Sequence, residues 1–98
     1  MLAAFSVTPL GVGDSVGELV AEAVRIVRAS GLPNETNAMF TNIEGSWDEV
    51  FAVLQQCVLR IAEDEPLVSV VLKLDYRPGV DHQLEHKVAS IDAHLADS

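Results

Sequence analysis

Apolar and polar positions alternate at the start of the chain, along the residues LAAFSVTP that run from Leu2 to Pro9. A period of two is typical of a β-strand with one buried face, and proline ends such a strand because it has no N–H for the ladder. From residue 15 to residue 30 the apolar positions recur every three or four residues, which predicts a helix with one buried stripe. Gly31 and Pro33 then stop this helix.

Two short strands follow, at residues 34–40 and 41–44, with a turn or bend between them. A second helix begins at SWDEV and ends at EDEP, and its apolar positions fall on one side: Trp47, Val50, Leu54, Cys57, Val58 and Ile61. Alternation returns after residue 67, where one face carries Val68, Val70, Leu72, Leu74 and Tyr76. A thinner apolar stripe then predicts a short third helix, with Leu84, Val88, Ile91 and Leu95.

This order of elements predicts an α+β fold: a ferredoxin-like βαββαβ antiparallel sheet with two helices on one face and an extra C-terminal helix. At 98 residues we expect one domain, residues 1–98. The other face of the sheet is left open, with apolar and polar groups together: Leu2, Ala4, Ser6, Asn37, Met39, Val71, Lys73, Asp75 and Arg77. A partner sheet or a ligand usually covers such a face, so we expect a homo-oligomer, either a dimer or a tetramer.

The charge balance excludes two classes of partner. The net charge is -9 and only six residues are Lys or Arg, so neither nucleic acid nor an anionic membrane is expected to bind. A cationic or neutral small ligand fits better. Cys57 is the only cysteine, which excludes an intrachain disulfide. The apolar N-terminal run has no basic residue before Arg25 and is too short to span a bilayer, so we expect a soluble cytoplasmic protein.

The glycine-containing stretch TPLGVGDSVGEL is not a phosphate loop. The third glycine of a dinucleotide fingerprint would fall at Val16, whereas this chain has Gly17, and no Gly-Lys-Ser/Thr triplet is present. Ser15 and Glu18 have the spacing of a capping box, which satisfies the amides that a phosphate would otherwise bind. The residues SWDE repeat this box at the second helix, so we interpret both as helix starts.

No catalytic residue, metal site or cofactor is expected. His82 and His86 are spaced i, i+4, but zinc sites need three or four ligands, and a solvated helix face explains the pair better. Cys57 lies on the apolar stripe of its helix, where thiols are usually inert. Glu44 and Asp75 lie on strands and need partners, such as Arg77, Lys73 or a cationic ligand. A salt bridge, ligand binding and acid/base chemistry all stay open for these two carboxylates.

Four segments, in order, carry a family resemblance. A strand ending in PLG, a helix ending in SGL, the motif T-x-I-E-G and a strand running into K-x-D-x-R resemble the small thiamine-binding (YkoF-like) family of ferredoxin-like proteins. The resemblance extends from about Leu2 to His94. It implies binding of thiamine or its hydroxymethylpyrimidine moiety without catalysis, by homodimers or homotetramers built through their sheets. By motif position, the residues that correspond to the family pattern are Pro9, Thr41, Glu44, Gly45, Asp75 and Arg77. A small residue usually precedes the threonine, whereas this chain has Phe40.

The chemistry of thiamine suggests further candidates, because it joins a hydrogen-bonding aminopyrimidine to a cationic thiazolium. Glu44 or Asp75, with Trp47 or Phe40, could hold the cation by charge and cation–π contact. Ser6 and Asn37 add polar groups on the open face. The candidate ligand-binding residues are therefore Ser6, Pro9, Asn37, Thr41, Glu44, Trp47, Asp75 and Arg77. We expect the ligand beside the strand end that carries Ser6, facing Glu44 and Asp75.

Two other functions are compatible with this order of elements. One is a regulatory interaction module whose open sheet face serves only assembly, with Glu44, Asp75 and Arg77 as interface salt bridges. The other is a cofactor-free enzyme of the dimeric α+β barrel type, against which stands the lack of an acid/base histidine on a predicted strand.

Overall fold

β1 (Leu2–Pro9) is an inner strand of an antiparallel sheet in the computed structural model, which describes residues 1–11, 16–79 and 82–96. The other strands are β2 (Asn34–Thr36), β3 (Thr41–Glu44) and β4 (Val68–Asp75), and the order across the sheet is β2-β3-β1-β4. All three pairings are antiparallel. The α+β fold predicted from the sequence is therefore confirmed.

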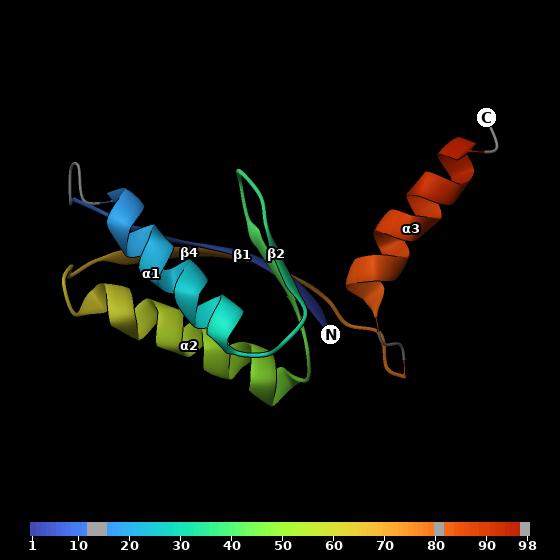
Figure 1. Ribbon diagram of the computed structural model, residues 1–98. Helices are drawn as coiled ribbons and strands as arrows, with labels where there is room; N and C mark the ends of the chain where they lie inside the picture. The colour runs from blue at the N-terminus through green and yellow to red at the C-terminus, as the bar shows by residue number, and fades with distance from the viewer. Residues whose placement is uncertain (12–15, 80–81, 97–98) are drawn as a thin grey trace.

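Both long helices cover the same face of the sheet. α1 (Val16–Ala29) and α2 (Trp47–Ala62) lie side by side against it, while α3 (Gln83–Ala96) projects from the far end of the molecule (Figure 1). The alternation of β1 has the predicted phase, because Ala3, Phe5 and Val7 are buried beneath the helices. The stripes of both helices complete this core, with Leu19, Ala23, Val27, Val50, Val53, Leu54, Cys57 and Ile61.

β4 also has the predicted phase but is less well covered. Its core-facing residues pair with those of β1, as Leu74 does with Ala3 and Leu72 with Phe5. Leu72 and Leu74 are only half-buried and Val70 is 39% exposed. The reason is position: β4 is an edge strand, so the helices shield one side of it less completely than they shield β1.

The strand predicted at residues 34–40 is shorter than expected, because β2 ends at Thr36. Asn37 causes this. Its side-chain Oδ1 accepts hydrogen bonds from the backbone N–H groups of Met39 and Phe40, both at 2.9 Å, and its own N–H donates to the carbonyl of Phe40. Asparagine stabilises turns in this way, so residues 37–40 form a turn rather than a strand.

The predicted capping box at the start of α2 is confirmed. Ser46 accepts from the N–H of Glu49 at 3.2 Å, and the Glu49 carboxylate accepts from the N–H of Ser46 at 2.9 Å. These hydrogen bonds hold the pKa of Glu49 below its usual value. The matching box expected at Ser15 and Glu18 involves a residue outside the described ranges.

Trp47 was expected on the core side of α2, and this prediction is wrong. The indole is 46% exposed and stacks on Phe51, with ring centroids 5.6 Å apart, and it also contacts Tyr76 at 5.7 Å. Trp47 and Phe51 are one turn apart, so they share a side of the helix that the sheet does not cover.

α3 contributes little to the core. Val88 is 52% exposed and Ile91 is 60% exposed. The radius of gyration, 15.0 Å, exceeds the roughly 13 Å typical of a compact domain of this length, in keeping with the projecting helix (Figure 1). Within the described part of the chain, no helix has the length and apolar character needed to cross a membrane.

The burial pattern predicts a large difference between the two faces of the sheet. Ile43 is fully buried, so Ile43→Val is expected to lower the free energy of unfolding by about 1 kcal/mol. Val71 is 54% exposed on the helix-free face of the single chain, and Val71→Ala is expected to change the free energy of unfolding of the monomer by less than about 0.5 kcal/mol. Urea denaturation of both variants measures the difference, and equal effects would contradict this assignment of the core.

Candidate functional site

The two neighbours of β1 pair with it over different lengths. β4 pairs along the whole strand, from Leu2↔Asp75 to Pro9↔Val68. β3 pairs only from Leu2↔Glu44 to Phe5↔Thr41, because the turn at residues 37–40 interrupts the hairpin. The second half of β1 therefore has a strand on one side only.

A cleft of about 200 Å³ occupies the unpaired side, and we call it the β1 cleft. Its walls are residues 5–8 of β1, residues 36–41 of the hairpin, and four apolar residues of α1: Val20, Ala23, Val24 and Val27. None of these described lining residues carries a charge. The β1 cleft is therefore suited to a neutral group with apolar faces and a polar edge.

Thr41 is the most deeply placed of the predicted site residues in the β1 cleft. Only 8% of it is exposed, and its hydroxyl lies 3.2 Å from the hydroxyl of Thr36. Asn37 lines the same cleft from the turn, and so does Phe40, which is half-buried. Phe40 therefore forms part of the wall of the β1 cleft.

Ser6 and Pro9 differ in their position relative to the β1 cleft. Ser6 lines it, but the alternation of β1 directs its side chain to the helix-free face, opposite to Phe5 and Val7. Pro9 is buried at the end of β1, where it pairs with Val68, and is not among the lining residues. The structure thus brings Ser6, Asn37 and Thr41 together at one cleft.

Glu44 lies at the other end of the sheet and has a partner that the sequence did not suggest. Its carboxylate, in a residue that is only 7% exposed, accepts from the N–H of Gln83 at 2.7 Å and of Leu84 at 3.2 Å. These are the first amides of α3, whose unsatisfied donors and positive dipole end attract a carboxylate. Glu44 therefore caps α3, in place of the expected pairing with Arg77 or Lys73.

Asp75 also holds α3, through an ion pair with Lys87. The hydrogen bond from Lys87 and its charge, together with the charge of Lys73, hold the pKa of Asp75 below its usual value. A lowered pKa means that the interaction stabilises the fold above the ordinary pKa of aspartate and is lost as the pH falls through the shifted pKa. The side chain is 38% exposed, so solvent screens the pair.

Glu44 and Asp75 do not face the strand end that carries Ser6, so that prediction is wrong. Both acidic residues pair with Leu2, whereas Ser6 pairs with Val71, four residues further along β1. At about 3.3 Å per residue this separation is roughly 13 Å. Glu44 instead shares a shallow recess of about 460 Å³ with Trp47, Tyr76 and Arg77.

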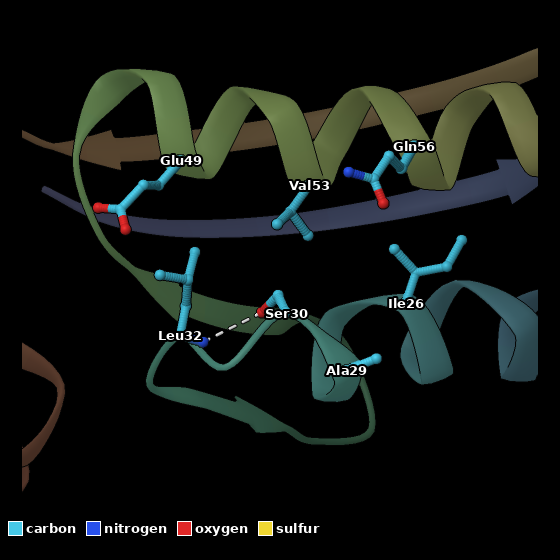
Figure 2. A pocket seen from close by; sticks show the side chains of 7 residues that line it. All are labelled: Ile26, Ala29, Ser30, Leu32, Glu49, Val53 and Gln56. Atoms are coloured by element: carbon cyan, nitrogen blue, oxygen red, sulfur yellow. Dashed lines mark hydrogen bonds between the residues drawn. The ribbon is translucent and has the colours of Figure 1, made fainter.

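A further cleft, of about 320 Å³, lies between α1 and α2 on the helical side (Figure 2). Two of its polar side chains already have partners: the Ser30 hydroxyl donates to the carbonyl of Val27 and accepts from the N–H of Leu32, while Glu49 belongs to the capping box. Gln56 and Ile26 also line it (Figure 2). Because Ser30 and Glu49 act within the protein, this cleft is a weaker candidate than the β1 cleft.

Neither Cys57 nor the two predicted histidines line the β1 cleft, although the Cys57 thiol donates to the carbonyl of Ala23, one of the lining residues, at 3.5 Å. Cys57 is fully buried, and burial raises the pKa of its thiol to about 11. His82 precedes α3 instead of lying in it, and its ring stacks on that of His86 with centroids 6.4 Å apart. In the described segments, no group of three or more His, Cys, Asp and Glu residues is placed to hold a metal ion.

Residues 3–92 match the family model described as thiamine-binding protein. The chain belongs to this family. A UPF0045 protein of Mycobacterium bovis is 57% identical over 96 residues, which are 97% of this chain and 94% of the relative. A UPF0045 protein of the cyanobacterium Synechocystis is 37% identical over 94% of this chain and 77% of its own length.

Solved structures of similar chains share the fold. The Methanocaldococcus jannaschii relative is 33% identical and superposes with a TM-score of 0.84, covering 93% of this chain and 94% of its own. A Thermotoga maritima protein, whose name refers to thiamine biosynthesis/salvage, has a TM-score of 0.81 at 19% identity, over 92% and 96% of the two chains. At that identity the likeness establishes the fold alone. The family named from the sequence motifs is confirmed by the match over residues 3–92.

Two residues at the β1 cleft were missed in the sequence. Thr36 was placed in a continuous strand, although its pairing with Thr41 through a short hairpin brings the two hydroxyls together. Val7 was assigned only to the core, because the alternation of apolar and polar residues predicts where side chains point but not which backbone groups lack a hydrogen-bond partner. Asn37 was the signal in the sequence that could have identified both residues, because asparagine favours a turn and a turn ends the strand pairing at this point.

The cap on α3 can be tested at the level of single amides. Glu44→Ala removes the acceptor of the Gln83 and Leu84 N–H groups, and hydrogen bonds to charged groups contribute about 1.5 kcal/mol or more. Both amides are therefore expected to exchange with solvent about tenfold faster. Glu35→Ala, which removes an exposed carboxylate from the neighbouring strand, is the matched control. Unchanged exchange in Glu44→Ala would contradict the capping role.

Proposed function

We propose that this protein binds thiamine, or its hydroxymethylpyrimidine moiety, without transforming it, and that the pyrimidine ring occupies the β1 cleft. Membership of the thiamine-binding protein family supports the ligand class. The location is supported by Thr41, which belongs to the T-x-I-E-G motif and lies almost buried in that cleft. Such a protein would act as a carrier, buffer or sensor of the ligand.

The observation that carries this proposal is the uncharged, hydroxyl-bearing lining of the β1 cleft. Pockets for drug-sized ligands measure roughly 300–1,000 Å³, so a cleft of about 200 Å³ suits one ring better than two. The neutral pyrimidine would lie inside and the cationic thiazolium outside. The net charge of -9 would then favour the cation through long-range attraction, without a carboxylate in contact.

Absence of catalysis is part of the proposal and is supported by the chemistry of the lining. The side chains that line the described cleft offer hydroxyls, one amide and apolar groups, none of which transfers protons readily near neutral pH. The same reasoning argues against the dimeric α+β barrel type of enzyme. No bound cofactor is required by this function.

We also propose that the protein assembles with copies of itself through its helix-free surfaces. Val71 on the open sheet face and Val88 and Ile91 on α3 are each more than half exposed. A projecting helix with an apolar stripe, beside an open sheet face, favours a second copy of this chain as the partner, since both surfaces would be buried together. Assembly and ligand binding are compatible because the β1 cleft opens between β1, α1 and the hairpin.

Ligand binding is tested by isothermal titration calorimetry with thiamine and with hydroxymethylpyrimidine. Thr41→Val removes one buried hydroxyl at similar volume and is expected to weaken binding about threefold to tenfold, the effect of losing a neutral hydrogen bond. Glu44→Gln, at the other end of the sheet, serves as the control and is expected to bind like the unmodified protein. Absence of heat at millimolar ligand would contradict the proposal, and a loss confined to Glu44→Gln would move the site to the recess beside Trp47.

Assembly is tested by sedimentation over a range of protein concentrations. Placing charges on the exposed stripe with Val88→Glu and Ile91→Glu together is expected to lower the mass to that of the monomer, because a buried interface excludes unpaired carboxylates. Leu59→Glu alters an equally exposed apolar residue on α2 and is expected to leave the mass unchanged. A monomer at every concentration of the unmodified protein would contradict self-assembly.

A further inference from the structure

The backbone groups of β1 point alternately to its two neighbours, and the hydrogen bonds identify which residues point where. The N–H of Leu10 donates to the carbonyl of Leu67, on the β4 side. Met1 exchanges hydrogen bonds with Gly45, on the β3 side, at 2.9 and 3.0 Å. Even-numbered residues of β1 therefore direct their N–H and C=O groups to β4, and odd-numbered residues direct theirs to β3.

Val7 is the residue of β1 whose N–H and C=O are both left without a partner by this alternation. It is odd-numbered, so its N–H and C=O point to the β3 side, but pairing with β3 ends at Phe5↔Thr41. Among the described residues no hydrogen bond is formed by either group of Val7. Val7 is nevertheless only 7% exposed, and it lines the β1 cleft.

A buried backbone N–H without a partner is rare in folded proteins and costs about as much as a lost hydrogen bond. The cost is removed when something in the β1 cleft supplies an acceptor. A docked β-strand is a poor candidate, because the next residue on this edge, Pro9, has no N–H and could not continue the ladder. The edge thus offers a single donor, the Val7 N–H, with the acceptor of the same extended residue beside it and the Pro9 carbonyl two residues further on.

We propose that the backbone of Val7 recognises an aromatic ring that carries an exocyclic amino group next to a ring nitrogen. The Val7 N–H donates to the ring nitrogen, and the Val7 C=O accepts from the amino group. The apolar side chains of α1 and Phe40 contact the faces of the ring. This inference rests on the proposed function for its location, but it names the feature of the ligand that is selected: the donor–acceptor edge of a 4-aminopyrimidine.

The specificity that follows is a matter of hydrogen-bond polarity. A 4-oxo pyrimidine has nearly the same size and shape, but it presents a carbonyl where the amino group was and an N–H where the ring nitrogen was. Its carbonyl would then face the Val7 carbonyl, and its N–H would face the Val7 N–H. Sites that hydrogen-bond a buried ligand group reject analogues that cannot match it, because the polar groups are left unpaired.

Two measurements on the unmodified protein test this proposal. Calorimetry compares thiamine with its 4-oxo analogue, oxythiamine, which is expected to bind at least tenfold more weakly. Amide hydrogen exchange follows Val7 with and without thiamine, and its N–H is expected to be protected at least tenfold by the ligand. The amide of Ser6 points to β4, where it is paired with Val71, and is the internal control. Equal affinity for the two compounds, or an unprotected Val7 amide in the thiamine complex, would overturn the inference.

Failure of the proposed function gives a different result. If thiamine produces no heat but a simple 4-aminopyrimidine protects the Val7 amide, recognition by Val7 stands and thiamine is the wrong ligand. If no aminopyrimidine protects this amide, the inference itself is overturned. Val7→Ala keeps the backbone groups and is expected to retain the preference for the amino compound. Val7→Pro deletes the N–H and is expected to lose the preference, provided that circular dichroism shows an intact fold.

Discussion

The unequal pairing of β1 is the constraint on which the rest of the structure depends. The side chains on one face of β1 pack into the core along the whole strand. Its backbone, however, forms hydrogen bonds with neighbouring strands on both edges only as far as Phe5. The turn made by Asn37 fixes this limit, because the hairpin cannot pair with β1 through a segment whose amides bind a side chain. One asparagine thereby shortens β2, opens the β1 cleft and leaves the backbone of Val7 unpaired.

The sequence predicted the elements well where periodicity alone decides them. β1 has the expected bounds, and α1 and α2 lie within about one residue of the expected helices, because their apolar positions repeat with the period of the structure. Failures occurred where a contact distant in sequence decided the outcome. Glu44 and Asp75 were recognised as acids in need of partners, but the partners, the first amides of α3 and Lys87, lie 39 and 12 residues away. The prediction for Trp47 failed because its position on α2 is compatible both with burial in the core and with exposure on the side of the helix.

Charged residues are absent from the described lining of the β1 cleft, although the protein as a whole is strongly acidic. The two carboxylates expected to hold a cation are engaged in fixing α3, and the β1 cleft is uncharged along its described lining. A protein with a charge of -9 still attracts cations over long distances, and such attraction raises association rates and weakens with salt. Under the proposed function, selection among similar rings comes from hydrogen bonds in the uncharged cleft, where an unmatched polar group is destabilising.

The positions of the two polar residues in the motif T-x-I-E-G explain why Thr41 and Glu44 have different roles. Successive side chains of a strand point to opposite faces, so two residues three positions apart cannot share a face. Thr41 lies on the helix side, opposite Phe5, and Glu44 lies on the helix-free side, opposite Leu2. One short strand thus places a hydroxyl in the β1 cleft and a carboxylate under α3, while Ile43 between them anchors both in the core. A shift of one residue in the register of β3 would exchange the two faces, burying the carboxylate beneath the helices and emptying the cleft of its hydroxyl.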